Sequence, residues 1–203
     1  MKRILFIFIS LLFFPLVTNA QWRIGVTGGV DYNLYTSDEH YLTDLYNEGM
    51  WGKVFGVACL YDIKDWQWCR SKIGVRAEVN YVDKYIRTLK GHPEIMLFIK
   101  KRSYLQLPVM VNYSLGNEEI RAFANIGGYC GWIISGKSNE WQRNFDIGGI
   151  GGLGAEYNLK HFTFQAEARC YASGRSVTKS DRKFETPHYN TTLVFQLALF
   201  YNL

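Results

Sequence analysis

A transmembrane helix needs about 20 consecutive apolar residues. After residue 20, no segment of this chain has such a run. Proline is scarce, with 4 among 203 residues, whereas glycine reaches 19 and aromatic residues 16%. Dense positive charge is also missing, because no cluster of Lys and Arg exceeds Lys100-Lys101-Arg102. The charge pattern therefore predicts no nucleic-acid partner, and the length suits one domain.

The first twenty residues have the three parts of a secretory signal peptide. Lys2 and Arg3 form a basic start, residues 4–17 are almost entirely apolar, and Thr18-Asn19-Ala20 fits a cleavage site. The alternative, a membrane anchor helix, would need a longer apolar run. We therefore expect residues 1–20 to direct export through the Sec pathway and residues 21–203 to form the mature domain. Losing the two basic residues lowers the formal net charge from +5 to +3.

The cysteines give no sign of a metal site. Cys59, Cys69, Cys130 and Cys170 match no zinc-binding spacing, and only Cys69 falls clearly in a predicted turn. An exported protein meets an oxidising compartment, so disulfides are allowed, but the sequence does not fix their connectivity. We favour free, packed thiols over a metal site.

The mature chain is dominated by alternation of apolar and polar residues, which is the signature of β-strands. In one such stretch, Ile73, Val75 and Ala77 alternate with Arg76 and Glu78. The alternation predicts about eight strands, the second of them the least regular, at residues 22–33, 52–62, 72–82, 104–114, 119–134, 145–159, 162–173 and 191–203. Soluble strands usually have about 5–6 residues, whereas a tilted membrane strand needs about 9–11. The predicted lengths therefore favour membrane strands.

The connections between the predicted strands alternate in length. If the N-terminus lies in the periplasm, all the outer connections are long, at residues 34–51, 83–103, 135–144 and 174–190. The inner connections 115–118 and 160–161 are very short. The inner connection 63–71 is the exception, and its Trp66 and Trp68 are candidates for the inner membrane interface. Long outer loops, short inner turns and an even strand count are typical of bacterial outer-membrane barrels.

Three features predict that the apolar face points into lipid and the polar face into the barrel. Glycine in a strand signals crowding on its side, and the polar face carries Gly25, Gly29, Gly74, Gly127, Gly131, Gly148, Gly152 and Gly154. Charges of both signs on that face can pair in a small lumen, namely Arg76, Arg121 and Arg169 with Glu78, Glu156 and Glu167. The last strand stays apolar at every outward position to Leu203, which resembles the C-terminal signal for the barrel-assembly machinery, although that signal normally ends in an aromatic residue.

The interior of such a barrel has two interpretations. Ionisable residues within a membrane suggest a path for protons or ions. We favour the alternative that these charges fill and rigidify the interior, because about eight strands enclose a space just filled by side chains. No open pore is therefore expected.

One glycine-rich motif resembles a cofactor site. Residues 149–154, Gly-Ile-Gly-Gly-Leu-Gly, match the dinucleotide fingerprint, which needs a helix after it. Residues 155–159 instead continue the strand alternation. We interpret the motif as a glycine-rich strand lining a crowded lumen, and we predict no cofactor.

The histidines offer a weak case for catalysis. His40, His92, His161 and His188 fall in predicted loops or strand ends, and no pair has the spacing of a zinc helix site. Barrel-type lipid hydrolases of the membrane use a Ser–His pair near the outer rim. His188 lies close to that rim with threonines nearby but no serine. We favour a solvated loop histidine and predict no catalytic residue.

An apolar stretch interrupts the outer connection 83–103. Residues 95–99 read Ile-Met-Leu-Phe-Ile. Such a stretch indicates a hairpin extending beyond the membrane or a partner surface. The simpler interpretation, which we favour, is that the following strand starts early.

Three segments resemble the PorT-like outer-membrane β-barrel family. Residues 104–113, Tyr-Leu-Gln-Leu-Pro-Val-Met-Val-Asn-Tyr, are similar to its Tyr-Leu-Glu-Ile-Pro strand. Residues 145–157 resemble its glycine-rich strand, and residues 167–174 resemble its Glu-Ala-Arg-Tyr-Ser-x-Gly segment, with Cys170 inserted before the tyrosine. The resemblance implies a small outer-membrane barrel, and one member of the family acts in type IX secretion. Pro108 within the first segment predicts a bulge or local break, because proline donates no ladder hydrogen bond.

Together these features predict an all-β fold, a closed antiparallel up-and-down transmembrane β-barrel of about eight strands in the outer membrane. We expect a non-enzymatic protein that is structural, or accessory to secretion or surface interaction through its outer loops. Its expected partners are outer-membrane lipid, the barrel-assembly machinery and envelope or secretion-system proteins. The alternatives are a lipid-modifying outer-membrane enzyme and a soluble secreted barrel that binds an apolar ligand.

Overall fold

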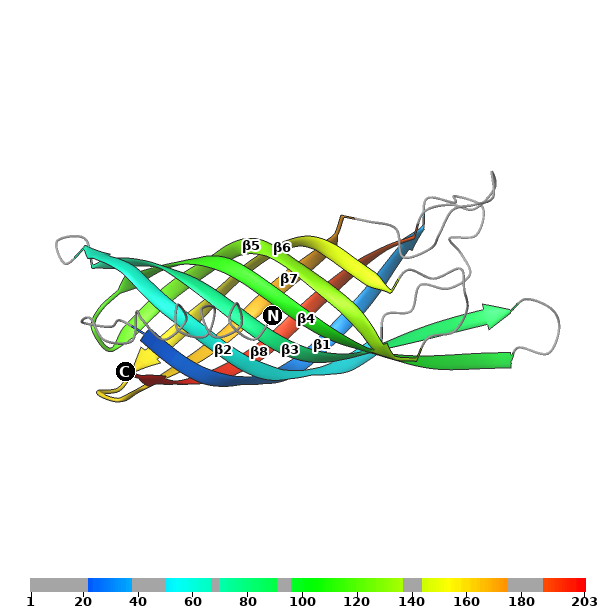
Figure 1. The fold of residues 1–203 in the computed structure, drawn as a ribbon, viewed down its shortest axis with the longest axis horizontal. Coiled ribbons are helices and arrows are strands. Elements are labelled where there is room, and N and C mark those ends of the chain that lie inside the picture. Colours follow the sequence, from blue (N-terminus) through cyan, green and yellow to red (C-terminus); the bar gives the residue numbers. More distant parts are fainter. Residues whose placement is uncertain (1–21, 38–49, 67–69, 91–95, 137–143, 175–187) are drawn as a thin grey trace, which may run out of the picture.

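Eight antiparallel strands follow one another around a closed barrel, and β8 returns to pair with β1 (Figure 1). The computed structural model describes residues 22–37, 50–66, 70–90, 96–136, 144–174 and 188–203. The strands are β1 (Trp22–Ser37), β2 (Met50–Trp66), β3 (Ser71–Lys90), β4 (Met96–Gly116), β5 (Ile120–Ser135), β6 (Phe145–Asn158), β7 (Phe162–Ser173) and β8 (His188–Asn202). Among these residues no helix is long and apolar enough to span a membrane. The predicted up-and-down barrel is confirmed, and closure leaves no strand edge unpaired in lipid.

The two faces of the strands are divided as predicted. Ile126 on β5 is 71% exposed, whereas the preceding Asn125 is 3% exposed. The same contrast recurs between Leu153, which is 69% exposed, and Arg169, which is 2% exposed. Apolar side chains thus cover the outside and polar side chains fill the inside, the inverse of a soluble barrel. The alternative of a soluble barrel with an apolar interior is therefore wrong.

Aromatic side chains form pairs near both ends of the outer surface. At the inner end the rings of Trp22 and Tyr61 lie 4.7 Å apart between centroids, and those of Phe162 and Tyr201 lie 5.6 Å apart. At the outer end the matching pairs are Tyr32 with Trp51 at 5.1 Å and Trp132 with Phe145 at 5.3 Å. Aromatic girdles at both membrane interfaces are typical of outer-membrane barrels.

Two predicted connections are shorter than expected. β2 continues to Trp66 and β3 begins at Ser71, so the predicted extent of the inner connection, 63–71, is wrong. Every inner turn is short. The cause is a register irregularity between Asp62 and Lys64, which interrupts the alternation that the prediction follows. The side chains of Trp66 and Trp68 lie outside the described residues.

The predicted extent of the outer connection, 83–103, is also wrong. β3 continues to Lys90 and β4 begins at Met96, so the favoured early start of the next strand is confirmed. The two strands stay paired from Asp83 with Ser103 out to Lys90 with Met96. They form a hairpin that projects past the other strands in Figure 1.

Pro108 interrupts one ladder without shifting it. The pairing of β3 with β4 passes from Ala77 opposite Val109 to Asn80 opposite Gln106 in unchanged register. A local break is therefore confirmed and a bulge is not present at this position. On its other side Pro108 keeps Tyr129 of β5 as its partner.

Candidate functional sites in the lumen and at its two ends

A network of four charged side chains crosses the middle of the lumen. Arg76 and Glu78 come from β3, and Glu167 and Arg169 come from β7. Arg169 Nη2 lies 2.6 Å from Glu78 Oε1, and Arg169 Nε lies 2.6 Å from Glu167 Oε1. Arg76 lies 2.5 Å from Glu78 and 3.1 Å from Glu167. Because β3 and β7 are not neighbours in the barrel, the pairs Arg169–Glu78 and Arg76–Glu167 bridge the lumen from one wall to the other.

Amide side chains add further hydrogen bonds to this network, although Arg76 Nη2 has no hydrogen-bond partner among the described residues. Asn80 donates to Glu78 at 2.7 Å, Asn125 donates to Glu167 at 2.6 Å, and Arg76 donates to Gln165 at 2.8 Å. The four charged side chains are at most 2% exposed. Buried charges persist when they are paired and hydrogen-bonded in this way. The predicted pairing of Arg76 and Arg169 with Glu78 and Glu167 is confirmed.

Apolar and aromatic side chains fill the lumen further toward the outer end. The cluster consists of Val54, Val82, Tyr104, Met110, Tyr129, Ile133, Ile150, Tyr171 and Val194, none of them more than 7% exposed. Tyr129 and Tyr171 pack edge to face with their centroids 5.2 Å apart. Tyr129 also donates to Asp146 at 3.0 Å. Together with the charged network, this cluster agrees with the expectation of a filled interior.

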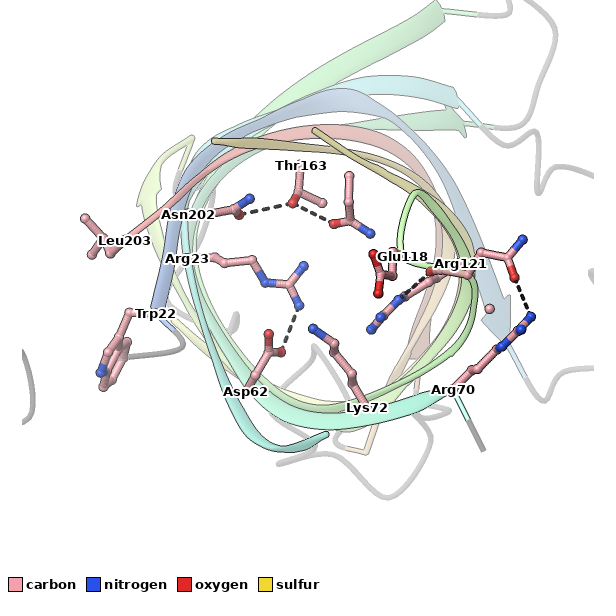
Figure 2. A pocket seen from close by; sticks show the side chains of 13 residues that line it. Trp22, Arg23, Asp62, Arg70, Lys72, Glu118, Arg121, Thr163, Asn202 and Leu203 are labelled. Carbon is pink, nitrogen blue, oxygen red and sulfur yellow. Dashed lines mark hydrogen bonds and ion pairs between the residues drawn. The ribbon is translucent and has the colours of Figure 1, made fainter. Parts of the chain in front are cut away.

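The inner end opens into a cavity of about 990 Å³, which we call the vestibule. Its lining carries four cationic side chains, Arg23, Arg70, Lys72 and Arg121, and two carboxylates, Asp62 and Glu118. Figure 2 shows these side chains arranged around the mouth. Arg23 is well compensated, because it lies 2.8 Å from Asp62 and 3.2 Å from Glu156 deeper in the lumen.

The cations on the other side of the vestibule are held by the turn between β4 and β5. Arg121 donates from Nε to the Asn117 carbonyl at 2.9 Å. Arg70 donates to the Asn117 side-chain oxygen at 3.0 Å. Arg70 is also the non-glycine residue with a left-handed backbone, at φ 51°, and its carbonyl accepts the Gly116 amide at 3.1 Å. Arg121 makes no ion pair among the described residues, so its predicted pairing in the lumen is wrong.

The structure brings a serine opposite His188. Ser37 at the end of β1 and His188 at the start of β8 are direct partners in the antiparallel ladder. Sequence reasoning missed this pair because the two residues are far apart in the chain and meet through the closure of the barrel. His161 lies in the exposed turn after β6, and His40 and His92 lie outside the described residues.

The remaining predicted features are structural in this fold. The motif 149–154 lies within β6, which confirms the strand interpretation. Cys59, Cys130 and Cys170 are free thiols on three different strands, and Cys69 lies outside the described residues. These thiols are half-buried or exposed, so the expectation that they are packed holds only in part. In the part of the chain that is described, no three His, Cys, Asp or Glu side chains gather into a metal-binding group.

Comparisons with known proteins agree with this architecture. Residues 18–173 match the family model of the outer membrane protein beta-barrel domain. A comparison with curated proteins finds no match. Among solved structures, the chain is similar to the outer membrane protein OprG from Pseudomonas aeruginosa, at 12% identity and a TM-score of 0.57 over 91% of this chain and 96% of that one.

Two further structures have the same kind of barrel. Neisserial surface protein A is 11% identical with a TM-score of 0.53, over 89% of this chain and 97% of that one. The outer membrane enzyme PagL is 10% identical with a TM-score of 0.45, over 86% and 97%. At such identities the likeness shows the fold alone. The family match supports a location in the outer membrane.

Proposed function

Because the chain belongs to the outer membrane protein beta-barrel domain family, we propose that it is a non-enzymatic, non-conducting barrel, structural or accessory to secretion or surface interaction. The observation that carries this proposal is the filled lumen. Ion pairs join β3 to β7 across the middle of the lumen, and an apolar cluster packs on their outer side. The parts of the barrel that remain available to other molecules are its two ends.

The outer end carries a structured element that suits such a role. β2 pairs with β3 out to Lys53 opposite Asp83, and β5 pairs with β4 out to Ser135 opposite Ser103. Beyond these positions, among the described residues, β3 and β4 pair only with each other, as far as Lys90 opposite Met96. We call this two-stranded part the outer hairpin. An ordered element displayed on a rigid barrel is a common place for binding function.

The specific form of the proposal is an accessory role in type IX secretion, suggested by the resemblance to PorT-like barrels. A deletion strain is expected to release fewer type IX cargo proteins into the medium, measured by mass spectrometry of the culture supernatant. The intact gene should restore their release. A variant in which Asn-Gly replaces residues 87–99 joins the ladder partners Ile86 and Lys100 by a short turn, and it should not restore release.

The controls separate the barrel from its hairpin. The shortened variant must still run as a heat-modifiable band, because the barrel below the hairpin is unchanged. Full restoration by that variant would remove the hairpin from the function. An unchanged supernatant in the deletion strain would remove the secretion role and leave a structural one.

One observation favours a second candidate, a lipid-modifying enzyme of the outer membrane. Ser37 and His188 are direct partners in the ladder near the outer rim, and serine with histidine is the residue combination of an activated nucleophile. On this hypothesis Ser37→Ala and His188→Ala each change the lipid A profile in the same way as gene deletion, measured by mass spectrometry. Thr191→Ala on the same strand is the control. A deletion strain with unaltered lipid A would exclude the candidate.

A further inference from the structure

Arg121 is a buried cation without a carboxylate partner. The residue is 7% exposed, and its Nη1 has no hydrogen-bond partner among the described residues. Its Nε donates a hydrogen bond to the uncharged Asn117 carbonyl at 2.9 Å. A buried charge without an opposite charge is costly. The other inward arginine near this end, Arg23, is instead neutralised by two carboxylates.

The surroundings of Arg121 add positive charge to a cavity that is open to the periplasm. Figure 2 shows Arg121 and Arg70 on one side of the vestibule, across from Arg23, with the amine of Lys72 between Asp62 and Arg121. Two carboxylates lie near Arg121, namely Glu118 in the same lining and Glu156 opposite it in the β5–β6 ladder. Among the described residues neither forms an ion pair with Arg121, and Glu156 pairs with Arg23 instead. The side of the vestibule formed by the β2–β3 turn and the start of β5 therefore carries two cations, Arg70 and Arg121, that form no ion pair among the described residues.

We propose that the vestibule binds an anionic group, a carboxylate or phosphate of a small periplasmic molecule, with Arg121 as its main contact. A guanidinium binds such groups through charge-assisted hydrogen bonds in a fixed planar geometry. Arg70 and Lys72 also line the vestibule and raise the local anion concentration. The ligand would supply the negative charge that the buried guanidinium lacks.

The depth of the vestibule makes this a binding site rather than the entrance of a channel. Glu156 and Gln165 lie behind its lining and are hydrogen-bonded to each other at 2.9 Å. Gln165 in turn accepts from Arg76 of the network across the lumen. A ligand entering from the periplasm therefore meets hydrogen-bonded side chains that join the vestibule to the charged network. This inference does not depend on what the outer hairpin contacts.

The test uses the full mature chain refolded in detergent micelles and titrated with inorganic phosphate and, separately, with citrate. Saturable shifts of the arginine Nε–Hε signals in nitrogen-15 NMR spectra are expected for at least one probe. Arg121→Gln should weaken that binding about tenfold or more, because it removes a charge-assisted contact. Arg70→Gln, an exposed position, should weaken it by about threefold.

The matched control removes the same charge from the opposite end of the barrel. Lys101 lies in the outer hairpin, where it is paired with Asp83 at 2.8 Å. Because this position is far from the vestibule, Lys101→Gln should leave the binding unchanged. Saturation by phosphate alone assigns the site to phosphate groups, and saturation by citrate alone assigns it to carboxylates. Shifts that never saturate, or that persist unchanged in Arg121→Gln, would overturn the proposal. If Arg121→Gln does not fold, unchanged binding in Arg70→Gln overturns it.

Discussion

Arg169→Met is expected to lower the free energy of unfolding by about 3–5 kcal/mol. Arg169 binds Glu78 and Glu167 with all of these groups buried in the lumen. Removing it leaves two buried carboxylates to share Arg76 alone, and an uncompensated buried charge costs more than the ion pair itself contributes. The measurement is a urea titration of the barrel in lipid vesicles, followed by tryptophan fluorescence.

Two controls identify the network as the cause. Arg70→Met removes an exposed cation from an inner turn and should change stability by less than about 0.5 kcal/mol. Replacing the whole network, with Arg76→Met, Glu78→Leu, Glu167→Leu and Arg169→Met together, should recover most of the loss, because packed apolar groups can substitute for a complete buried ion network. If Arg169→Met behaved like Arg70→Met, the ion pairs across the lumen would not be present in the membrane.

The strands and their faces were predictable because they depend on local sequence. Alternation alone assigns Ile126 to lipid and Asn125 to the lumen, and the structure agrees. Strand ends were less predictable. The irregularity beside Asp62 breaks the alternation, and the long pairing up to Lys90 depends on a partner strand that the local pattern does not identify.

The pairings within the lumen follow from closure of the barrel rather than from local sequence. Composition and alternation indicate that arginines and glutamates share the interior, but the partner of each depends on which strands face one another. Arg169 reaches Glu78 on the opposite wall, whereas Arg121 sits too close to the inner mouth and meets the Asn117 carbonyl instead. The position of Ser37 opposite His188 in the ladder likewise requires the pairing of β1 with β8. These relations need the register of the whole barrel.

Valine substitutions at two glycines of β6 are expected to change the free energy of unfolding in opposite directions. Gly154→Val should lower the free energy of unfolding by about 1–3 kcal/mol, the usual cost of overpacking. A Cβ at Gly154 would lie 2.5 Å from the Phe123 ring and 2.5 Å from the Ala166 carbonyl oxygen. Gly151→Val should instead raise it by up to about 1 kcal/mol, because valine has less backbone freedom to lose and suits a strand.

The comparison is matched because both glycines lie in one strand and receive the same side chain. A Cβ at Gly151 meets nothing within 4 Å, and its neighbour Leu153 already points outward at 69% exposure. The added valine there gains contact with lipid, whereas the valine at Gly154 has to displace a ring inside the lumen. Urea midpoints in the same vesicles measure both effects. The two expected effects differ in sign only because the two glycines lie on opposite faces of β6. If Gly151→Val destabilised the barrel and Gly154→Val had no effect, the glycine-rich face would point toward lipid. The assignment of inside and outside would then be reversed.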